Sequence, residues 1–287
     1  MKFAKELLEN QVFEDSLLSK NYYPDLSNNG ANAFKNMELQ EDGSWLLHLH
    51  APSAKEVKVV PQYGQPSKEG YAAMEDEPVY GEKDEEGTFH LTLPWHENRT
   101  GSRSLKVYID GVLVIWPYFP VAFGSNRIQN FLEFPDEEMS FSYIRNVPRG
   151  AIVSQSYHSS VTGKEERCMV YLPSGYTRNN EDYPVLYLLH GGSDNETSWF
   201  TRARIDTILD NLLADKECVP FLVVTINDMY TSKEDSCKRD WSKVDGTTER
   251  VLLEDCIPFI ETNYRVKTEQ CYRAIGGLSL GALQACD

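Results

Sequence analysis

One serine stands in a sequence context that favours nucleophilic chemistry. Residues 277–281 read Gly-Leu-Ser-Leu-Gly, a G-x-S-x-G pattern with Ser279 at its centre. Because the apolar run 271–275 precedes it, we expect a sharp turn from a strand into a helix here. Gly277 and Gly281 leave room for that turn, and the helix N-terminus brings backbone N–H groups to the serine hydroxyl. The pattern therefore predicts a serine nucleophile for acyl transfer.

A second run predicts the backbone donors that such a serine needs. His190, Gly191 and Gly192 directly follow the apolar run 184–189. Where a serine sits on such a turn, one N–H that holds the oxyanion comes from this kind of loop and the other from the residue after the nucleophile. We expect Gly192 and Leu280 to be these donors, each worth about 3 kcal/mol to the transition state, with His190 and Gly191 supporting the loop. A plain glycine turn with a structural histidine is the alternative.

The elements around these runs alternate between strand and helix. Continuous apolar runs predict buried strands, and apolar residues at helical spacing predict helices. This order predicts right-handed crossovers and a mostly parallel sheet, that is, an α/β domain over residues 146–287. The expected strands are 151–157, 167–172, 184–189, 221–226 and 271–275, and the expected helices are 204–216 and 247–264, the latter bent at Pro258. Cys168, Cys256 and Cys271 lie within these elements and are expected to be buried thiols.

The first half of the chain has a different pattern. A short amphipathic helix is expected within residues 1–25, and short alternating strands predict a small β-sandwich over residues 26–145. Asp110-Gly111 between two alternating runs predicts a tight hairpin. The acidic run 75–86 is expected to be a solvated loop rather than a calcium site. His48 and His50 share a strand face and are interpreted as surface or packing residues.

With these motifs in place, the chain from about Arg149 resembles the esterase D or feruloyl-esterase-like family of α/β-hydrolases, which includes carbohydrate esterases acting on xylan side chains. The resemblance rests on the stretches SSVTGKEERCMVYLPSGY, YPVLYLLHGGSDNETSWF, ARIDTILDNLLADKECVPFLVV, CIPFIETNYRV and YRAIGGLSLGALQA. The runs APSAKEVKVV and LKVYIDGVLV are similar to the immunoglobulin-like, early-set domain that precedes many of these esterases. The expected fold is therefore an N-terminal β-sandwich followed by a partial α/β-hydrolase domain.

The resemblance assigns roles to individual residues. It implies that Ser279 is the nucleophile and that Gly192 and Leu280 hold the oxyanion. Trp199 occupies a place that the family often fills with an aromatic residue. It is either part of a substrate wall or a packing residue.

The catalytic acid and histidine are expected to lie outside the chain. In this fold the triad runs Ser, then Asp or Glu, then His along the sequence. The six histidines are His48, His50, His90, His96, His158 and His190, and none follows Ser279. Asp287 is too close to the serine to be the acid. We therefore expect a chain that stops about 70–100 residues before its fold is complete, leaves an apolar sheet edge exposed and is nearly inactive alone.

Three functions remain open at this point. The first is serine-dependent hydrolysis of feruloyl or acetyl esters on plant polysaccharide through an acyl-enzyme. The second is hydrolysis of an enterochelin-type siderophore, since that relative also pairs a sandwich with a hydrolase domain. The third is a non-catalytic carbohydrate-binding protein whose sandwich presents aromatic side chains; the candidates are Trp95, Tyr108, Trp116 and Tyr118.

Composition limits the partners and the location. The net charge of −16 disfavours nucleic acid and anionic membranes as partners. No C-x-x-C spacing occurs among the six cysteines, so a zinc site is not expected. None of the three functions implies a cofactor. The start of the chain lacks the unbroken apolar stretch of a secretory signal, which predicts a cytoplasmic protein. The partner expected is a small-molecule or oligosaccharide ester, with a homo-oligomer possible.

Overall fold

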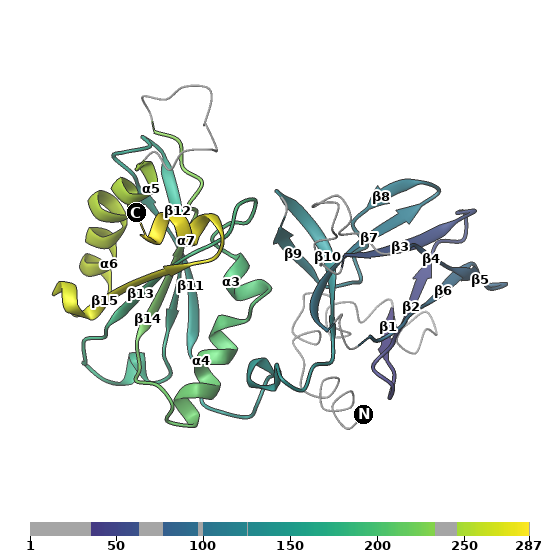
Figure 1. Cartoon of the computed structure of the whole chain (residues 1–287), viewed down its shortest axis with the longest axis horizontal. Coiled ribbons are helices and arrows are strands. Elements are labelled where there is room, and N and C mark those ends of the chain that lie inside the picture. Colours follow the sequence, from purple (N-terminus) through teal and green to yellow (C-terminus); the bar gives the residue numbers. More distant parts are fainter. Residues whose placement is uncertain (1–35, 63–76, 97–99, 125, 233–245, 287) are drawn as a thin grey trace. The chain divides into compact units, whose positions relative to one another are not determined.

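The computed structural model describes residues 36–62, 77–96, 100–124, 126–232 and 246–286. The chain forms two compact units (Figure 1). The first unit contains Met1–Ala122 and Ile128–Arg145, and the second contains Phe123–Arg127 and Asn146–Asp287. The helix expected within residues 1–25 lies outside the described residues.

Two antiparallel sheets are built from residues 37–134. The first has the order β1-β2-β6-β5, and the second has the order β4-β3-β7-β10-β9 with β8 paired to β7. The strands are β1 Met37–Leu39, β2 Trp45–His50, β3 Val57–Gln62, β4 Val79–Tyr80, β5 Glu82–Lys83, β6 Thr88–Leu93, β7 Gly101–Ile109, β8 Val112–Val114, β9 Val121–Gly124 and β10 Arg127–Phe134. A short 3-10 helix, η2 Ser140–Ser142, follows.

One apolar core lies between these two sheets. Alternate residues of β2 and β6 are buried against alternate residues of β3 and β7, as the period of two in their sequences predicts. Leu47 and Val59 are fully buried examples. The predicted hairpin is confirmed, because Asp110 and Gly111 both have positive φ, 49° and 80°.

One expectation for this half needs correction. The acidic run is not simply a loop, because the short strands β4 and β5 lie within it.

The aromatic residues considered for a carbohydrate platform mostly belong to the core or pack against it. Trp116 is buried in the core, and Trp95 and Tyr118 pack against it. Tyr108 is half-buried, and the ammonium of Lys58 lies 5.4 Å from its ring centre.

The second unit contains a five-stranded mixed sheet. Its order is β11-β12-β14-β13-β15. The pairs β13–β14 and β13–β15 are parallel, whereas β11–β12 and β12–β14 are antiparallel. The three strands that alternate with helices, β13, β14 and β15, are therefore parallel as predicted, and the β11–β12 hairpin adds antiparallel pairing at the other side of the sheet. The strands are β11 Ala151–His158, β12 Glu165–Leu172, β13 Val185–Leu189, β14 Leu222–Ile226 and β15 Arg273–Gly277.

Helices cover both faces of this sheet. Phe200 and Leu209 pack with Tyr171 and Val223 on one face, and Val251, Leu252, Cys256 and Ile260 pack on the other. The first group belongs to α3 Ser198–Thr201 and α4 Ile205–Ala214. The second belongs to α5 Thr247–Arg250, the π-helical segment η4 Val251–Cys256 and α6 Ile257–Asn263. The remaining elements are η3 Tyr176–Arg178, η5 Gln270–Tyr272 and α7 Leu280–Cys286.

Pro258, where a bend is expected, lies in the first turn of α6, directly after the π-helical segment η4. Among the helices of the described ranges, none combines the length and apolar character of a membrane span.

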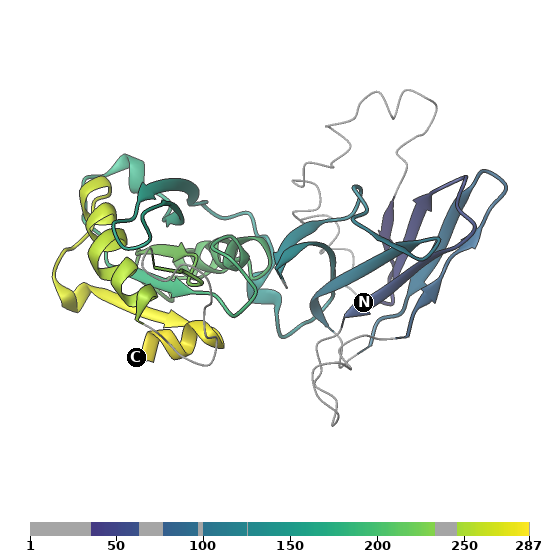
Figure 2. The ribbon, with the colours of Figure 1, turned by 90° about the horizontal axis from the view of Figure 1, so that it is seen from above.

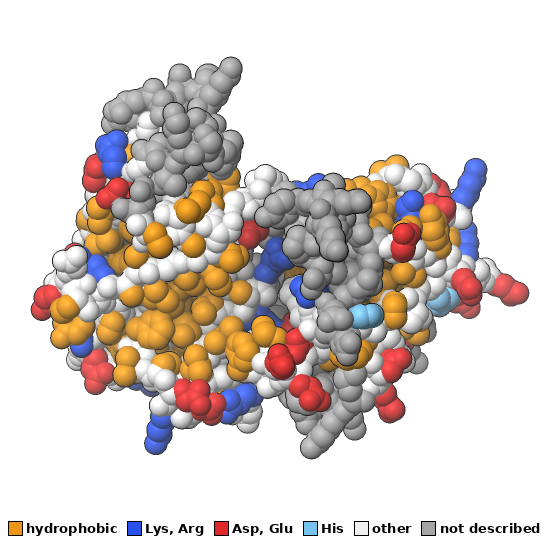
Figure 3. Space-filling model, in the orientation of Figure 1, with side chains coloured by type: hydrophobic (Ala, Val, Ile, Leu, Met, Phe, Trp, Pro, Cys, Tyr) orange, Lys and Arg blue, Asp and Glu red, His pale blue; other side chains and the backbone are white. Residues whose placement is uncertain are grey.

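The strand β15 lies at the margin of the sheet, not inside it. Figure 2 shows β15 and α7 in yellow at this margin, and β13 is the strand that pairs with β15. Ile275 is 43% exposed, Leu278 55% and Leu283 63%. These exposed side chains form the apolar sheet edge that the sequence predicts. The strand itself is less buried than its apolar run predicts, and Cys271 is exposed, whereas Cys168 and Cys256 are buried as predicted. Apolar side chains gather on the face of the second unit that carries β15 and α7 (Figure 3).

This open margin predicts self-association of the 287-residue chain. An edge strand with exposed apolar side chains pairs readily with another chain. We expect Ile275→Lys to reduce the concentration-dependent increase in apparent mass measured by light scattering. Ile152→Lys is the matched control, because Ile152 is 42% exposed on β11 at the opposite margin of the same sheet. Equal effects of the two substitutions would contradict a specific role for β15.

Candidate active site

Ser279 occupies the turn between β15 and α7. Its φ is 52°, a left-handed conformation that costs a non-glycine residue energy and therefore needs support from its surroundings. Two backbone hydrogen bonds provide that support. The N–H of Leu278 donates to the carbonyl of Leu189 at 3.3 Å, and the N–H of Gly281 donates to the carbonyl of Leu278 at 2.9 Å. The side chain of Ser279 is consequently held in an exposed position at the carboxyl end of β15.

The two glycines of the motif allow the turn to close. A Cβ added to Gly277 would lie 2.3 Å from the backbone carbon of Gly281. A Cβ added to Gly281 would lie 2.4 Å from the carbonyl oxygen of His190 and 2.8 Å from the carbonyl carbon of Leu189. Any side chain here would push α7 away from the end of β13. The glycines therefore set how closely the serine approaches the loop after β13.

That loop lies directly beside the serine. The Cβ position of Gly191 is 3.6 Å from the Cβ of Ser279, and that of Gly192 is 3.9 Å from the Cβ of Leu280. Leu280 is the first residue of α7, where N–H groups have no intrahelical acceptor. The structure thus brings together the predicted nucleophile and both predicted oxyanion donors.

His190 is buried beneath this loop and is only 2% exposed. Its Nδ1–H donates to the carbonyl of Gly191 at 2.7 Å, and its Nε2 accepts the N–H of Asp228 at 3.2 Å. The Nδ1 atom also lies 3.2 Å from Oδ1 of Asp228. Burial lowers the pKa of His190, against a smaller opposing effect of the bond to Gly191, so the ring is neutral. With both nitrogens engaged, His190 is a positioning residue and not a base for Ser279.

The carbonyl of Asp228 extends this network to α7. It accepts hydrogen bonds from Oγ1 of Thr248 at 2.8 Å and from Nε2 of Gln284 at 2.9 Å. Nε2 of Gln284 also donates to Oγ1 of Thr248 at 3.0 Å. One connected set of polar groups therefore links the loop after β13, the end of β14, α5 and α7. Sequence reasoning missed Asp228 and Gln284, because no motif marks residues that act through a backbone carbonyl.

Trp199 is half-buried on α3. Its indole N–H donates to the carbonyl of Leu189 at 3.0 Å, the same oxygen that accepts the N–H of Leu278. The contact agrees with the packing interpretation of Trp199 and leaves the substrate-wall role a prediction. Asp194, in the same loop, has a pKa raised by burial, partly offset by Arg202 at 3.9 Å.

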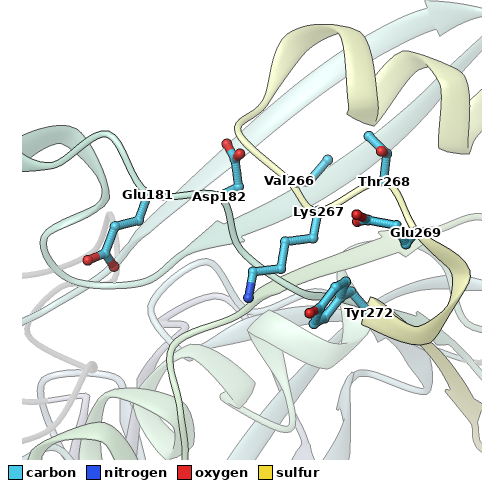
Figure 4. A pocket seen from close by; sticks show the side chains of 7 residues that line it. All are labelled: Glu181, Asp182, Val266, Lys267, Thr268, Glu269 and Tyr272. Atoms are coloured by element: carbon cyan, nitrogen blue, oxygen red, sulfur yellow. The ribbon is translucent and has the colours of Figure 1, made fainter.

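A surface pocket of about 640 Å³ lies elsewhere on the second unit (Figure 4). Its lining residues are Glu181, Asp182, Val266, Lys267, Thr268, Glu269 and Tyr272. They come from the segments just before β13 and β15, whereas Ser279 and the glycine loop follow the other ends of these strands. The ammonium of Lys267 lies over the ring of Tyr272, 4.4 Å from its centre. This pocket is therefore not part of the candidate active site.

Comparison with known proteins agrees with this geometry. Residues 159–286 match the model of the family named Esterase. This part of the chain is thus similar to carboxylic-ester hydrolases of that family. The match of this esterase region includes the loop after β13 and the Ser279 turn.

Individual relatives differ in what they share. An endo-1,4-beta-xylanase/feruloyl esterase of Xylanibacter ruminicola is 36% identical over 182 residues, which are 61% of this chain and 25% of that protein. Endo-1,4-beta-xylanase Y of Acetivibrio thermocellus is 30% identical over 154 residues, which are 50% of this chain and 13% of that protein. The chain thus spans a quarter or less of these relatives. The enterobactin esterase of Shigella flexneri has a TM-score of 0.58 at 12% identity and covers 91% of this chain and 71% of its own, a likeness of fold.

Because Gly281 lies so close to the backbone at the end of β13, an alanine there should affect stability more than an alanine at Gly276. Gly281→Ala should lower the free energy of unfolding of the esterase region by about 1–3 kcal/mol, because the new methyl group meets backbone that has to move. The measurement is chemical denaturation. Gly276→Ala is the control, since its Cβ would meet Leu188 at an ordinary 3.8 Å and should change the stability little. Equal loss of stability in both variants would contradict the role assigned to Gly281.

Proposed function

We propose that this chain carries the nucleophile and the oxyanion-binding groups of a serine carboxylic-ester hydrolase. The observation that carries the proposal is the position of Ser279. Its φ is 52°, and a Cβ added to Gly191 would lie 3.6 Å from the Cβ of Ser279. A strained, exposed serine beside two glycines at the end of a strand is the arrangement of a nucleophile in acyl transfer. The esterase family match supports the same reaction class.

The proposed chemistry proceeds through an acyl-enzyme. The Ser279 oxygen bonds to the acyl carbon while a general base takes its proton, and the carbonyl oxygen becomes an oxyanion that the N–H groups of Gly192 and Leu280 stabilise. The intermediate collapses, the alcohol leaves with a proton, and water then releases the acid. His190 holds the Gly192 loop in place during these steps. No cofactor enters the reaction.

Within the part of the chain that the structure describes, no side-chain contact joins a general base to Ser279. None of the six histidines follows the serine in the chain, and both ring nitrogens of His190 are engaged. A serine without its base keeps the contribution of the oxyanion hole, on the order of 10³–10⁴-fold over water. We therefore infer that the isolated chain hydrolyses esters only slowly.

Feruloyl or acetyl esters of plant polysaccharide are the proposed substrates. Support comes from the two relatives with the names quoted above, both of which are xylanases and one of which is also a feruloyl esterase. The alternative is an enterochelin-type siderophore ester. It is supported by the fold likeness that extends over 91% of the chain and therefore over both units. That likeness also supports an immunoglobulin-like character for the first unit.

A non-catalytic carbohydrate-binding role has less support. Trp116 is part of the core of the first unit, and Trp95 and Tyr118 pack against it, so three of the four aromatic candidates do not form a platform. A retained role of this kind would depend on Tyr108 and its neighbours. Pull-down of the chain on insoluble xylan distinguishes it from the enzyme, because a carbohydrate-binding protein is retained without any dependence on Ser279.

Added imidazole should reveal the nucleophile. The purified chain is expected to hydrolyse methyl ferulate about 10⁶-fold more slowly than an esterase with a complete triad, since loss of the histidine alone has an effect of this size. Imidazole in the buffer should raise the rate, and Ser279→Ala should remove the imidazole-dependent part. Liquid chromatography of released ferulate measures both. Fast turnover without imidazole that Ser279→Ala abolishes would show that the chain contains a base for Ser279. The assignment of Ser279 as the nucleophile would still stand.

The preference for the acyl group can be tested by measuring which ester acylates Ser279 faster. With imidazole present, the nitrophenyl ester of ferulate should acylate Ser279 faster than the nitrophenyl ester of 2,3-dihydroxybenzoate, and intact-mass spectrometry reads the adduct directly. Ser279→Ala controls for labelling elsewhere. Faster labelling by the dihydroxybenzoyl ester would instead favour the siderophore alternative.

A further inference from the structure

Two histidines of the first unit face each other across neighbouring strands. His48 on β2 and His90 on β6 are direct cross-strand partners in the first sheet (Figure 1). Their Nδ1 atoms lie 2.7 Å apart, and the rings meet edge to face with centres 4.9 Å apart. The ring of His48 thus has a partner on the neighbouring strand. Its partner lies 42 residues away along the chain and was not visible as a motif.

Each ring directs its other nitrogen to a carboxylate. Nε2 of His90 lies 2.9 Å from Oδ2 of Asp84, and Nε2 of His48 lies 3.6 Å from Oε1 of Glu38. Asp84 is itself fixed, because its Oδ1 accepts the N–H groups of Thr88 at 2.8 Å and Glu86 at 2.9 Å. The carboxylate behind His90 is thus held in a defined position.

The position of the protons follows from these contacts. A carboxylate oxygen of Asp84 accepts the Nε2–H of His90, so the Nδ1 of His90 presents a lone pair to His48. The contact between the two Nδ1 atoms then holds one proton, donated by His48. A cation replaces this proton once the two rings turn so that both lone pairs meet beside the line between the Nδ1 atoms, because an ion about 2 Å from each nitrogen does not fit on that line. The displaced proton moves to Nε2 of His48, on the side of Glu38.

We propose that His48 and His90 bind a divalent first-row transition metal ion through their Nδ1 atoms. A metal-bound histidine almost always donates its other ring N–H to a carboxylate or carbonyl, and here a carboxylate already stands behind each ring. Two nitrogens bound to one ion at right angles lie about 2.9 Å apart, close to the 2.7 Å in the structure. This spacing fits the tetragonal geometry of Cu²⁺ or Ni²⁺ better than tetrahedral zinc.

The site is small and water completes it. Within the described ranges, no group of three or more His, Cys, Asp or Glu residues gathers around a possible metal position, so the protein supplies two ligands. Glu82 is the cross-strand neighbour of His90 on β5, and the chain carries a net charge of −16, so the surrounding field favours a cation. The bound ion links β2 to β6. It stabilises the first unit by mass action and is independent of the chemistry proposed for Ser279.

Calorimetry with Ni²⁺ tests the site on the full 287-residue chain at neutral pH. The unmodified chain should bind one Ni²⁺ at this position, and His90→Gln should abolish that binding event. Asp84→Asn should weaken the affinity roughly 10-fold, because it removes the carboxylate that orients the ligand ring. His50→Gln is the matched control. His50 shares the sheet face with His48, but its Nδ1 contacts Oγ1 of Thr88 at 3.1 Å, so binding should be unchanged.

Imidazole NMR locates the ion independently of the titration. Paramagnetic Ni²⁺ should broaden the ring signals of His48 and His90 first, with those of His50 and His96 affected only at higher concentration. Thermal unfolding of the metal-free variants checks that each one folds. Equal binding by the His90→Gln variant, initial broadening at His50 or His96, or no binding by the unmodified chain would each overturn the proposal.

Discussion

The contact between Gly281 and the end of β13 is the constraint on which the rest of the candidate site depends. The first turn of α7 lies so close to the carbonyls of Leu189 and His190 that no side chain fits between them. This approach brings the serine turn and the Gly191–Gly192 loop side by side, although the two lie far apart in the sequence. It also explains how a serine can be held at a positive φ, because the backbone on either side of it is fixed by contacts to another strand. Packing of backbone against backbone thus creates the catalytic geometry.

A buried polar network secures the other side of the same loop. His190 bonds its own neighbour Gly191 and the backbone of Asp228, and Gln284 connects Asp228 back to α7. Burial keeps the imidazole neutral, which its role as acceptor of the Asp228 N–H requires. A protonated ring would lose that acceptor. The histidine next to the glycine pair therefore acts as a structural support whose two bonds hold the loop in one arrangement.

Local patterns predicted what local forces determine. The strand periodicity, the Asp110–Gly111 hairpin and the serine turn were all predictable, because each depends on residues adjacent in the sequence. The exposed sheet edge beside β15 was also expected, whereas the exposure of Cys271 was not, since burial at a given position depends on which elements pack beside it. The same holds for the His48–His90 pair, which depends on the register between β2 and β6. Asp228 and Gln284 contribute to the site without any signature in their own neighbourhood.

The open margin of the sheet lies next to the candidate nucleophile. Gly191 lies close to Ser279, and the helix α7 begins directly after it. Ile275 and Leu278, just before the serine in the chain, are 43% and 55% exposed. An edge strand with exposed apolar side chains pairs readily with another chain or segment. Packing on this surface would also exclude the water that weakens electrostatic contacts at the candidate site.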